Sequence, residues 1–111
     1  MAHQYGAKVT GTATVTAAGS EDIFAAPGAA LRHTICRGVV SVCVLAANAT
    51  VALDDGTTTI WEVAASNAAQ LISHTINFGD EGYHLGKNKA FRLTVADGDA
   101  EAKATFVGYT R

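Results

Sequence analysis

The side chains with the most chemical potential in this chain are its four histidines and ten acidic residues. Histidine binds metals and transfers protons near neutral pH, and paired carboxylates hold metals or act as general acid and base. A metal site requires two or three such side chains at short spacing, as in a His-x-His strand pair. The histidines are instead spread along the chain, at His3, His33, His74 and His84. Their spacing predicts structural or surface roles and no metal site.

The acidic residues gather at three glycine-containing sites. These are Asp54-Asp55-Gly56, Asp80-Glu81-Gly82 and Asp97-Gly98-Asp99. Oxygen-rich loops attract calcium, but the ligand pattern of an EF-hand is absent from all three. Asp and Gly are also the residues that tight turns need for conformational reasons, so we interpret the three sites as turns.

The common nucleophile and nucleotide-binding motifs are absent from the sequence, which has no G-x-S-x-G elbow, no P-loop and no G-x-G-x-x-G. A Ser-His-Asp triad that is assembled in space needs no local spacing, so the sequence leaves that arrangement open. We expect a protein that is not an enzyme and that uses no cofactor.

Charge argues against nucleic acid as a partner, and the absence of a long apolar stretch argues against a membrane-spanning helix. The formal net charge is −2, and the basic residues lie among acidic ones, whereas phosphate binding needs clustered Lys and Arg. No apolar stretch approaches the 18 residues or so that a membrane-spanning helix needs.

The first residues, MAHQYGAKVT, do not resemble a secretory signal, so we expect synthesis in a reducing cytoplasm. There, Cys36 and Cys43 are expected as two buried free thiols, with a Cys36–Cys43 disulfide as the alternative.

Short strands must position all of these side chains, because period-two alternation recurs from Lys8 to Tyr109. Lys8–Thr16 alternates Thr with Val, Gly and Ala, as a strand with one polar face does. Val39–Ala46 is nearly all apolar, as a strand covered on both faces would be. A shorter strand is predicted before it, over Leu31–Cys36, and the intervening Arg37-Gly38 suits either a tight turn or a bulge. Residues 1–7 show no periodicity and are expected to form a flexible arm ahead of a single domain over residues 8–111.

The number and spacing of these segments predict the fold class. About eight short strands with turn signals every ten residues or so are typical of an antiparallel sandwich or a small barrel. The apolar strand Val39–Ala46 favours two packed sheets, and the only short helical candidate is one turn within Ala64–Gln70. We therefore predict an all-β protein, an antiparallel β-sandwich of about eight strands.

The clearest hairpin lies within Asn48–Val63, and its turn decides which way Trp61 points. A two-residue Asp55-Gly56 turn, which Asp-Gly favours, places Trp61 on the face opposite Val51 and Leu53. A three-residue loop places Trp61 on the same face as those two residues. We favour the two-residue turn.

Aromatic residues and a histidine provide the candidate contacts with a partner. Trp61 is either core filler or an exposed platform for a sugar or a protein. Tyr83 and His84 lie in the glycine-rich segment Gly79–Asn88, which we expect to be a long polar loop with these two residues at its tip.

The order of features from Leu31 to Tyr109 resembles a known family. An apolar strand (Val39–Leu45) is followed by the hairpin TVALDDGTTTIWEV, a strand ending at Phe78, a Gly82–Gly86 loop, the strand FRLTVADGDA and a terminal strand closing on Val-Gly-Tyr. This order resembles the small head decoration, or cement, proteins of tailed bacteriophages, which have a jelly-roll-like sandwich fold.

The resemblance implies a structural virion protein that performs no chemistry. Such a protein binds the major capsid protein on the outside of an assembled head, often as a homotrimer, and reinforces the shell. Its N-terminal arm commonly reaches a neighbouring subunit or the shell, which would make His3, Gln4 and Tyr5 contact residues. The alternative is a receptor- or glycan-binding sandwich of a phage fibre or tail, which would place Trp61, Tyr83 and His84 together on an exposed surface.

Overall fold

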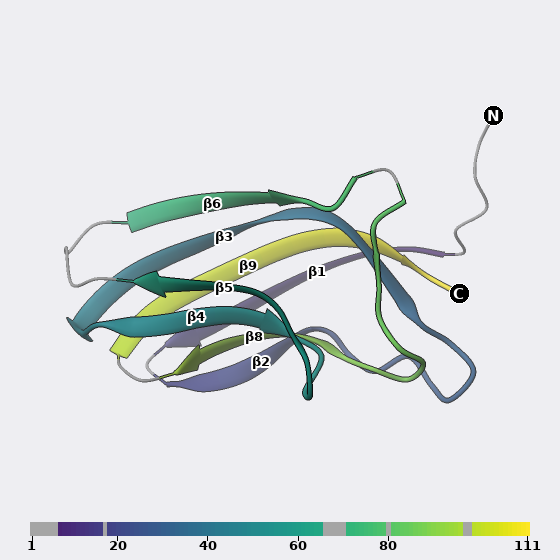
Figure 1. The fold of residues 1–111 in the computed structure, drawn as a ribbon, viewed down its shortest axis with the longest axis horizontal. Coiled ribbons are helices and arrows are strands. Elements are labelled where there is room, and N and C mark those ends of the chain that lie inside the picture. The colour runs from purple at the N-terminus through teal and green to yellow at the C-terminus, as the bar shows by residue number, and fades with distance from the viewer. Residues whose placement is uncertain (1–6, 17, 66–70, 80, 97–98) are drawn as a thin grey trace.

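Nine β-strands in two antiparallel sheets make up the described part of the chain in the computed structural model (Figure 1). The structure describes residues 7–16, 18–65, 71–79, 81–96 and 99–111, apart from the side chains of residues 45–47 and 99. The strands are β1 (Ala7–Thr16), β2 (Gly19–Phe24), β3 (His33–Ala47), β4 (Ala49–Asp54), β5 (Thr59–Ala65), β6 (Leu71–Asn77), β7 (Tyr83–His84), β8 (Phe91–Ala96) and β9 (Asp99–Thr110). The all-β prediction is confirmed.

The strand order is that of a jelly roll. Sheet A has the order β1-β9-β3-β6, with the short β7 also paired to β3, and sheet B has the order β2-β8-β4-β5. The chain passes back and forth between the sheets, except within the β4–β5 hairpin and between β6 and the short β7. Two interlocked four-stranded Greek keys of this kind define the jelly roll, so the predicted sandwich is confirmed with its topology.

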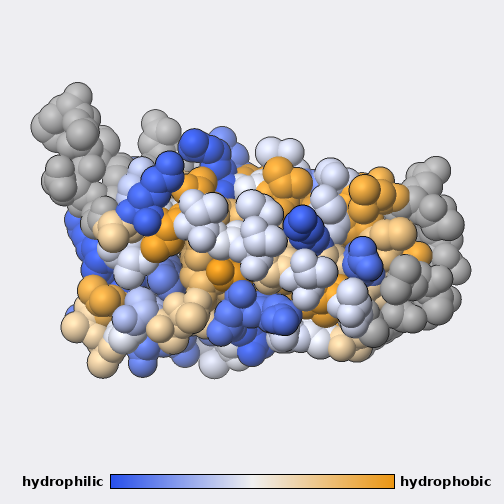
Figure 2. All heavy atoms as spheres, turned by 180° about the vertical axis from the view of Figure 1, so that it is seen from behind, coloured by the Kyte–Doolittle hydropathy of each residue, from blue (hydrophilic) through white to orange (hydrophobic). Residues whose placement is uncertain are grey.

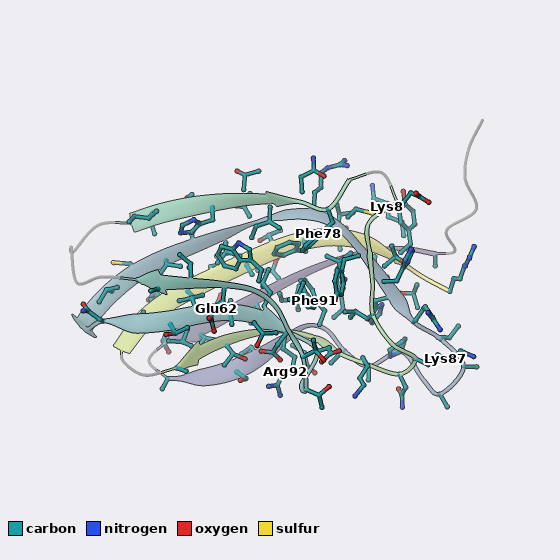
Figure 3. All side chains as sticks on the ribbon, viewed as in Figure 1. Lys8, Glu62, Phe78, Lys87, Phe91 and Arg92 are labelled. Carbon is teal, nitrogen blue, oxygen red and sulfur yellow. The ribbon has the colours of Figure 1, made fainter. Side chains whose placement is uncertain are left out.

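The core between the sheets is built from few large side chains and many small ones. Ala100, Ala102 and Ala104 of β9 are fully buried and let the sheets approach closely. Phe91, Phe106 and Phe24 fill the wider part, where the Phe91 and Phe106 rings meet edge to face with centroids 5.1 Å apart. Figure 3 shows Phe91 in the middle of the sandwich.

One lateral side of the sandwich is closed by glycine. Gly11 of β1 faces β2 so closely that a Cβ at this position would overlap the carbonyl oxygen of Ile23 and come within 2.7 Å of the Phe24 ring. On the opposite side, β5 and β6 are bridged by side chains, with the Trp61 and His74 ring centroids 5.4 Å apart. We call this second side the β5–β6 seam.

Strand boundaries differ from the prediction mainly in β3, where two predicted strands are one. The register of β3 against β9 shifts between Ile35 and Arg37, so a bulge lies at Cys36, and Arg37-Gly38 is paired within the strand and forms no turn. A bulge lets the strand bend without leaving the sheet. Ala7, which was assigned to the arm, is the first residue of β1 and pairs with Thr110. Part of the predicted helical turn, residues 66–70, lies outside the described residues.

Candidate interaction surfaces

The β4–β5 hairpin closes through a four-residue loop, so the prediction of a two-residue turn is wrong. Asp54 pairs with Thr59 and Leu53 pairs with Trp61, which leaves Ile60 as the extra residue of a bulge. Trp61 therefore shares the inner face of sheet B with Leu53. Glu62, the next residue along β5 and labelled in Figure 3, is exposed and pairs with Ala52 on the outer face of sheet B.

Aspartate side chains explain why the loop is longer. The Oδ1 atom of Asp55 accepts hydrogen bonds from the amides of Thr57 (2.9 Å) and Thr58 (2.7 Å). The Oδ1 atom of Asp54 accepts one from the amide of Gly56 (2.8 Å). In a two-residue turn, such backbone amides would be available for hydrogen bonds between the two strands. Here the aspartate oxygens accept those hydrogen bonds, which favours the longer loop. Partial burial alone would raise the pKa of Asp55, but the bonds from Thr57 and Thr58 and the nearby Lys89 ammonium outweigh it, and the pKa lies below its ordinary value.

Asp54 also fixes the outer face of sheet B. It is 8% exposed, and its carboxylate accepts hydrogen bonds from Arg92 Nε (2.9 Å) and from the Thr94 hydroxyl (2.6 Å). These residues lie in a hollow of about 300 Å³ whose lining also includes Ala52 and Glu62. Since bonds within the protein account for both oxygens of Asp54, its arrangement is explained by the fold of the hairpin.

Trp61 is half-buried and does not form an exposed platform. Its indole packs against the core and lies tilted against the His74 ring across the β5–β6 seam. Of the two alternatives for this residue, the structure favours core filler.

Tyr83 and His84 lie on a strand and not at a loop tip. They form β7 and pair with Ile35 and Thr34 of β3. Tyr83 is half-buried, with its ring centroid 5.7 Å from that of Phe78. His84 is exposed, and its Nδ1 atom lies 2.9 Å from the Thr34 hydroxyl.

The Gly79–Asn88 segment is therefore not the long open loop that was predicted. Leu85 is 1% exposed and anchors the segment in the core, and its amide donates to the carbonyl of His33. His3, Gln4 and Tyr5 lie outside the described residues.

The remaining histidine and the cysteines have structural surroundings. His33 is buried, with Nε2 2.7 Å from the carbonyl oxygen of Ala25 and Nδ1 2.7 Å from the Thr110 hydroxyl. Cys36 is buried and Cys43 is half-buried, and no disulfide joins them. Since they are seven positions apart on one strand, about 23 Å at 3.3 Å per residue, a disulfide between them is impossible. Across the ranges that the structure describes, there is no group of histidine, cysteine and acidic side chains that could hold a metal, and no helix that could span a membrane.

The outer face of sheet A is the broadest surface with an unusual composition (Figure 2). Small hydroxyl side chains are frequent on it, and four charged residues, Lys8, Arg37, Glu101 and Lys103, lie among them: the hydroxyl residues are Thr10, Thr12, Thr14, Ser41, Ser73, Thr75 and Thr105. Several meet in pairs, as at Thr12 and Thr105, whose oxygens are 3.2 Å apart. A shallow hollow of about 310 Å³ lies among Thr10, Val39 and Thr75, and Val39 is 40% exposed in it.

Exposed large hydrophobic side chains also lie on β6, the edge strand of sheet A. Leu71 is 70% exposed on the outer face, and Ile72 is 47% exposed although it points to the same side as the buried Ile76. These residues were not among the predicted contacts. Two adjacent apolar residues at the start of an alternating strand were the available signal, because one of the two must face outward.

No family model and no curated protein matches this chain. Among solved structures, a chain of the Bacillus endospore appendages, a family of disulfide-linked pili, matches with a TM-score of 0.48 and 11% identity over 94% of this chain and 88% of that chain. A chain of the virus-like particle of the extra small virus of the prawn Macrobrachium rosenbergii matches with a TM-score of 0.45 and 15% identity over 93% and 79%. A chain of CapF matches with a TM-score of 0.35 and 8% identity over 94% and 25%. Likenesses this weak leave the function to the geometry of the chain itself.

Proposed function

We propose that this chain is a structural virion protein, a decoration or cement subunit that binds the outer surface of a phage head and stabilises it through protein–protein contacts. The observation that supports this most is the outer side of sheet A, where Val39 and Leu71 are exposed among small hydroxyl and scattered charged side chains. Exposed large apolar side chains on such a surface are suited to burial against another protein. The jelly roll itself is an architecture of viral capsid domains and of lectins.

The proposed mechanism is multivalent contact. Each copy would bind the major capsid protein weakly, and a homotrimer would bind much more tightly because its second and third contacts form at high effective concentration. His3, Gln4 and Tyr5 of the arm, together with the exposed His84, would contact the shell. Trp61 and Tyr83 would act indirectly, by holding the strands that carry these contacts.

The glycan-binding alternative has no comparable support. It required Trp61, Tyr83 and His84 together on an exposed surface, but Trp61 and Tyr83 are half-buried. Trp61 lies against His74, whereas Tyr83 lies against Phe78. On the outer face of sheet A, the described strands place one Phe, Tyr or Trp side chain, Tyr109 of β9, and it is half-buried, so it forms no exposed platform.

Cosedimentation with phage heads tests the proposed function. Purified chain is mixed with heads of the virus that encodes it, prepared without the chain, and the bound fraction is measured after centrifugation. We expect saturable binding and heads that release their DNA at a higher temperature. A variant that lacks residues 1–6 should bind more weakly by about tenfold, because it loses one set of contacts per copy. Heads that sediment without the chain at micromolar concentration would overturn the proposal.

A further inference from the structure

The two sheets differ in how their edges are protected. Natural sheets commonly place charges or proline on edge strands to prevent pairing with another chain. Both edges of sheet B carry carboxylates, Glu21 and Asp22 on β2 and Glu62 on β5. The edges of sheet A are less protected, because β6 contains no acidic residue, lysine, arginine or proline, and β1 carries one charge, Lys8, near its first residue, followed by the uncharged Val9–Thr16. Sheet A is therefore open to pairing at both edges.

The backbone of β6 offers a row of hydrogen-bonding groups at its free edge. The amide of Phe78 donates to the carbonyl of Cys36 on β3 (2.8 Å). In an antiparallel pair, alternate residues direct their backbone groups to the same neighbour, so Ile76, His74 and Ile72 also face β3. The backbone groups of Ser73 and Thr75 consequently point away from the sheet, as do those of Leu71 and Asn77. No strand within the described ranges pairs with them.

The same alternation, followed across sheet A, defines the free edge of β1. Gly38 faces β6, so its neighbour Val39 faces β9 and pairs there with Thr105. Phe106 then faces β1 and pairs with Gly11. The backbone groups of Thr10, Thr12 and Thr14 therefore point outward, with their side chains on the outer face of the sheet.

The two free edges match each other. β1, β9, β3 and β6 alternate in direction, so β6 runs opposite to β1. A second copy placed beside the first in the same orientation would bring its β1 antiparallel to β6. The outward backbone groups on both strands belong to residues whose side chains lie on the same, outer face, as hydrogen-bonded pairs require. On that face, Ser73 and Thr75 would meet Thr10–Thr14, which are also small and uncharged.

We propose that β6 of one copy pairs antiparallel with β1 of a second copy, so that sheet A continues from subunit to subunit. β6 is seven residues long, about 23 Å at 3.3 Å per residue, so the pairing would extend along one side of the sandwich. The contact would also cover the exposed Ile72 at the β5–β6 seam. The partner in this contact is a second copy of the chain, whatever else the assembly binds.

Head-to-tail pairing is favoured over pairing of β6 with β6 of a second copy. A two-fold β6–β6 contact would leave the uncharged stretch Val9–Thr16 of β1 exposed twice on every dimer. A head-to-tail contact uses both edges of sheet A in each copy, and a ring that closes leaves none unpaired.

Cysteine cross-linking tests the pairing. One tagged chain carries Ser73→Cys, and a second chain with a different tag carries Thr10→Cys, Thr12→Cys or Thr14→Cys, all with Cys43→Ser. After mixing and mild oxidation, we expect a disulfide between the two kinds of chain, strongest at one β1 position, because paired residues bring their Cα atoms to about 5.5 Å. A chain with Glu62→Cys on the sheet B edge serves as the control and should not cross-link. Linkage of Ser73→Cys chains to one another, or no linkage at any β1 position, would overturn the proposal.

A charge on the edge provides an independent readout. Thr75→Lys places a cation on an exposed residue of β6 and should weaken self-association by about tenfold or more, as edge lysines do in natural sheets. Thr59→Lys makes the same change on an exposed residue of β5 and should leave it unchanged. Light scattering measures the association, and thermal melts show that both variants fold. Equal association of the two variants would contradict the pairing.

Discussion

Replacing Phe106 by Ala is expected to lower the free energy of unfolding by about 3–5 kcal/mol, the usual cost of truncating a buried aromatic. Phe106 is 1% exposed and meets Phe91 edge to face. Its two cross-strand neighbours are Gly11 and Gly38, so no side chain of an adjacent strand can fill the space that the ring leaves. A domain is typically stable by about 5–15 kcal/mol, so this single change should remove a large share of the stability.

Urea unfolding followed by Trp61 fluorescence measures this effect. Phe78→Ala provides the matched control, because Phe78 is only partly buried at the edge of the core, and its loss should cost clearly less. Phe106→Leu should fall between the two. A loss below about 1 kcal/mol for Phe106→Ala, the size of an average substitution, would show that the core does not rest on this ring.

The second large effect is expected from one added methyl group. Gly11→Ala would put a Cβ into the carbonyl oxygen of Ile23 and against the Phe24 ring. Because the nearest obstacle is backbone and not a flexible side chain, relief requires β1 and β2 to separate. We expect a loss of about 3 kcal/mol, the upper end for overpacking.

Gly86→Ala is the control for this change. The nearest atom to a Cβ at Gly86 is Cγ of Lys89 at 3.6 Å, an ordinary contact, and its backbone needs no left-handed conformation. Its midpoint in urea should stay within error of the unaltered chain. If Gly11→Ala unfolds at the same urea concentration as Gly86→Ala, the sandwich is not closed at β1 and β2 in the way described.

Most strands could be predicted from the sequence, because the alternation of polar and apolar residues is a local property of each strand. The Lys8–Thr16 pattern corresponds to β1, with its threonines outside, and the apolar Val39–Ala46 lies within the central strand β3. The jelly-roll order could not come from alternation, because strand pairing depends on which sheet each crossing enters. The resemblance to decoration proteins supplied that expectation.

Two local errors have physical causes. In the hairpin, Asp54 and Asp55 take loop amides with their side chains, and this competition outweighed the preference of Asp-Gly for a two-residue turn. In Gly79–Asn88, the single buried residue Leu85 is enough to hold a polar segment against β3. A lone apolar residue among glycines carries no periodicity, so the pattern could not distinguish this anchored segment from an open loop.

The predicted contact residues show why an interaction surface is harder to predict from the sequence than a strand. Aromatic residues were chosen because they dominate interfaces, but Trp61 and Tyr83 are half-buried within this chain. The features that carry the proposals belong to whole strands: the edge strand β6 and the stretch Val9–Thr16 of β1, which lack acidic residues, lysine and arginine, and the hydroxyl-rich face between them. Such features become visible only once the sheet order shows which strands lie at an edge.

Electron cryomicroscopy of phage heads incubated with the purified chain tests the central claim, that this sandwich is a decoration subunit, most directly. The account predicts density for the sandwich on the outer surface of the shell, in groups of three at three-fold positions, with sheet A continuous from β6 of one copy to β1 of the next. Bare heads, or isolated sandwiches whose sheets do not touch, would contradict it.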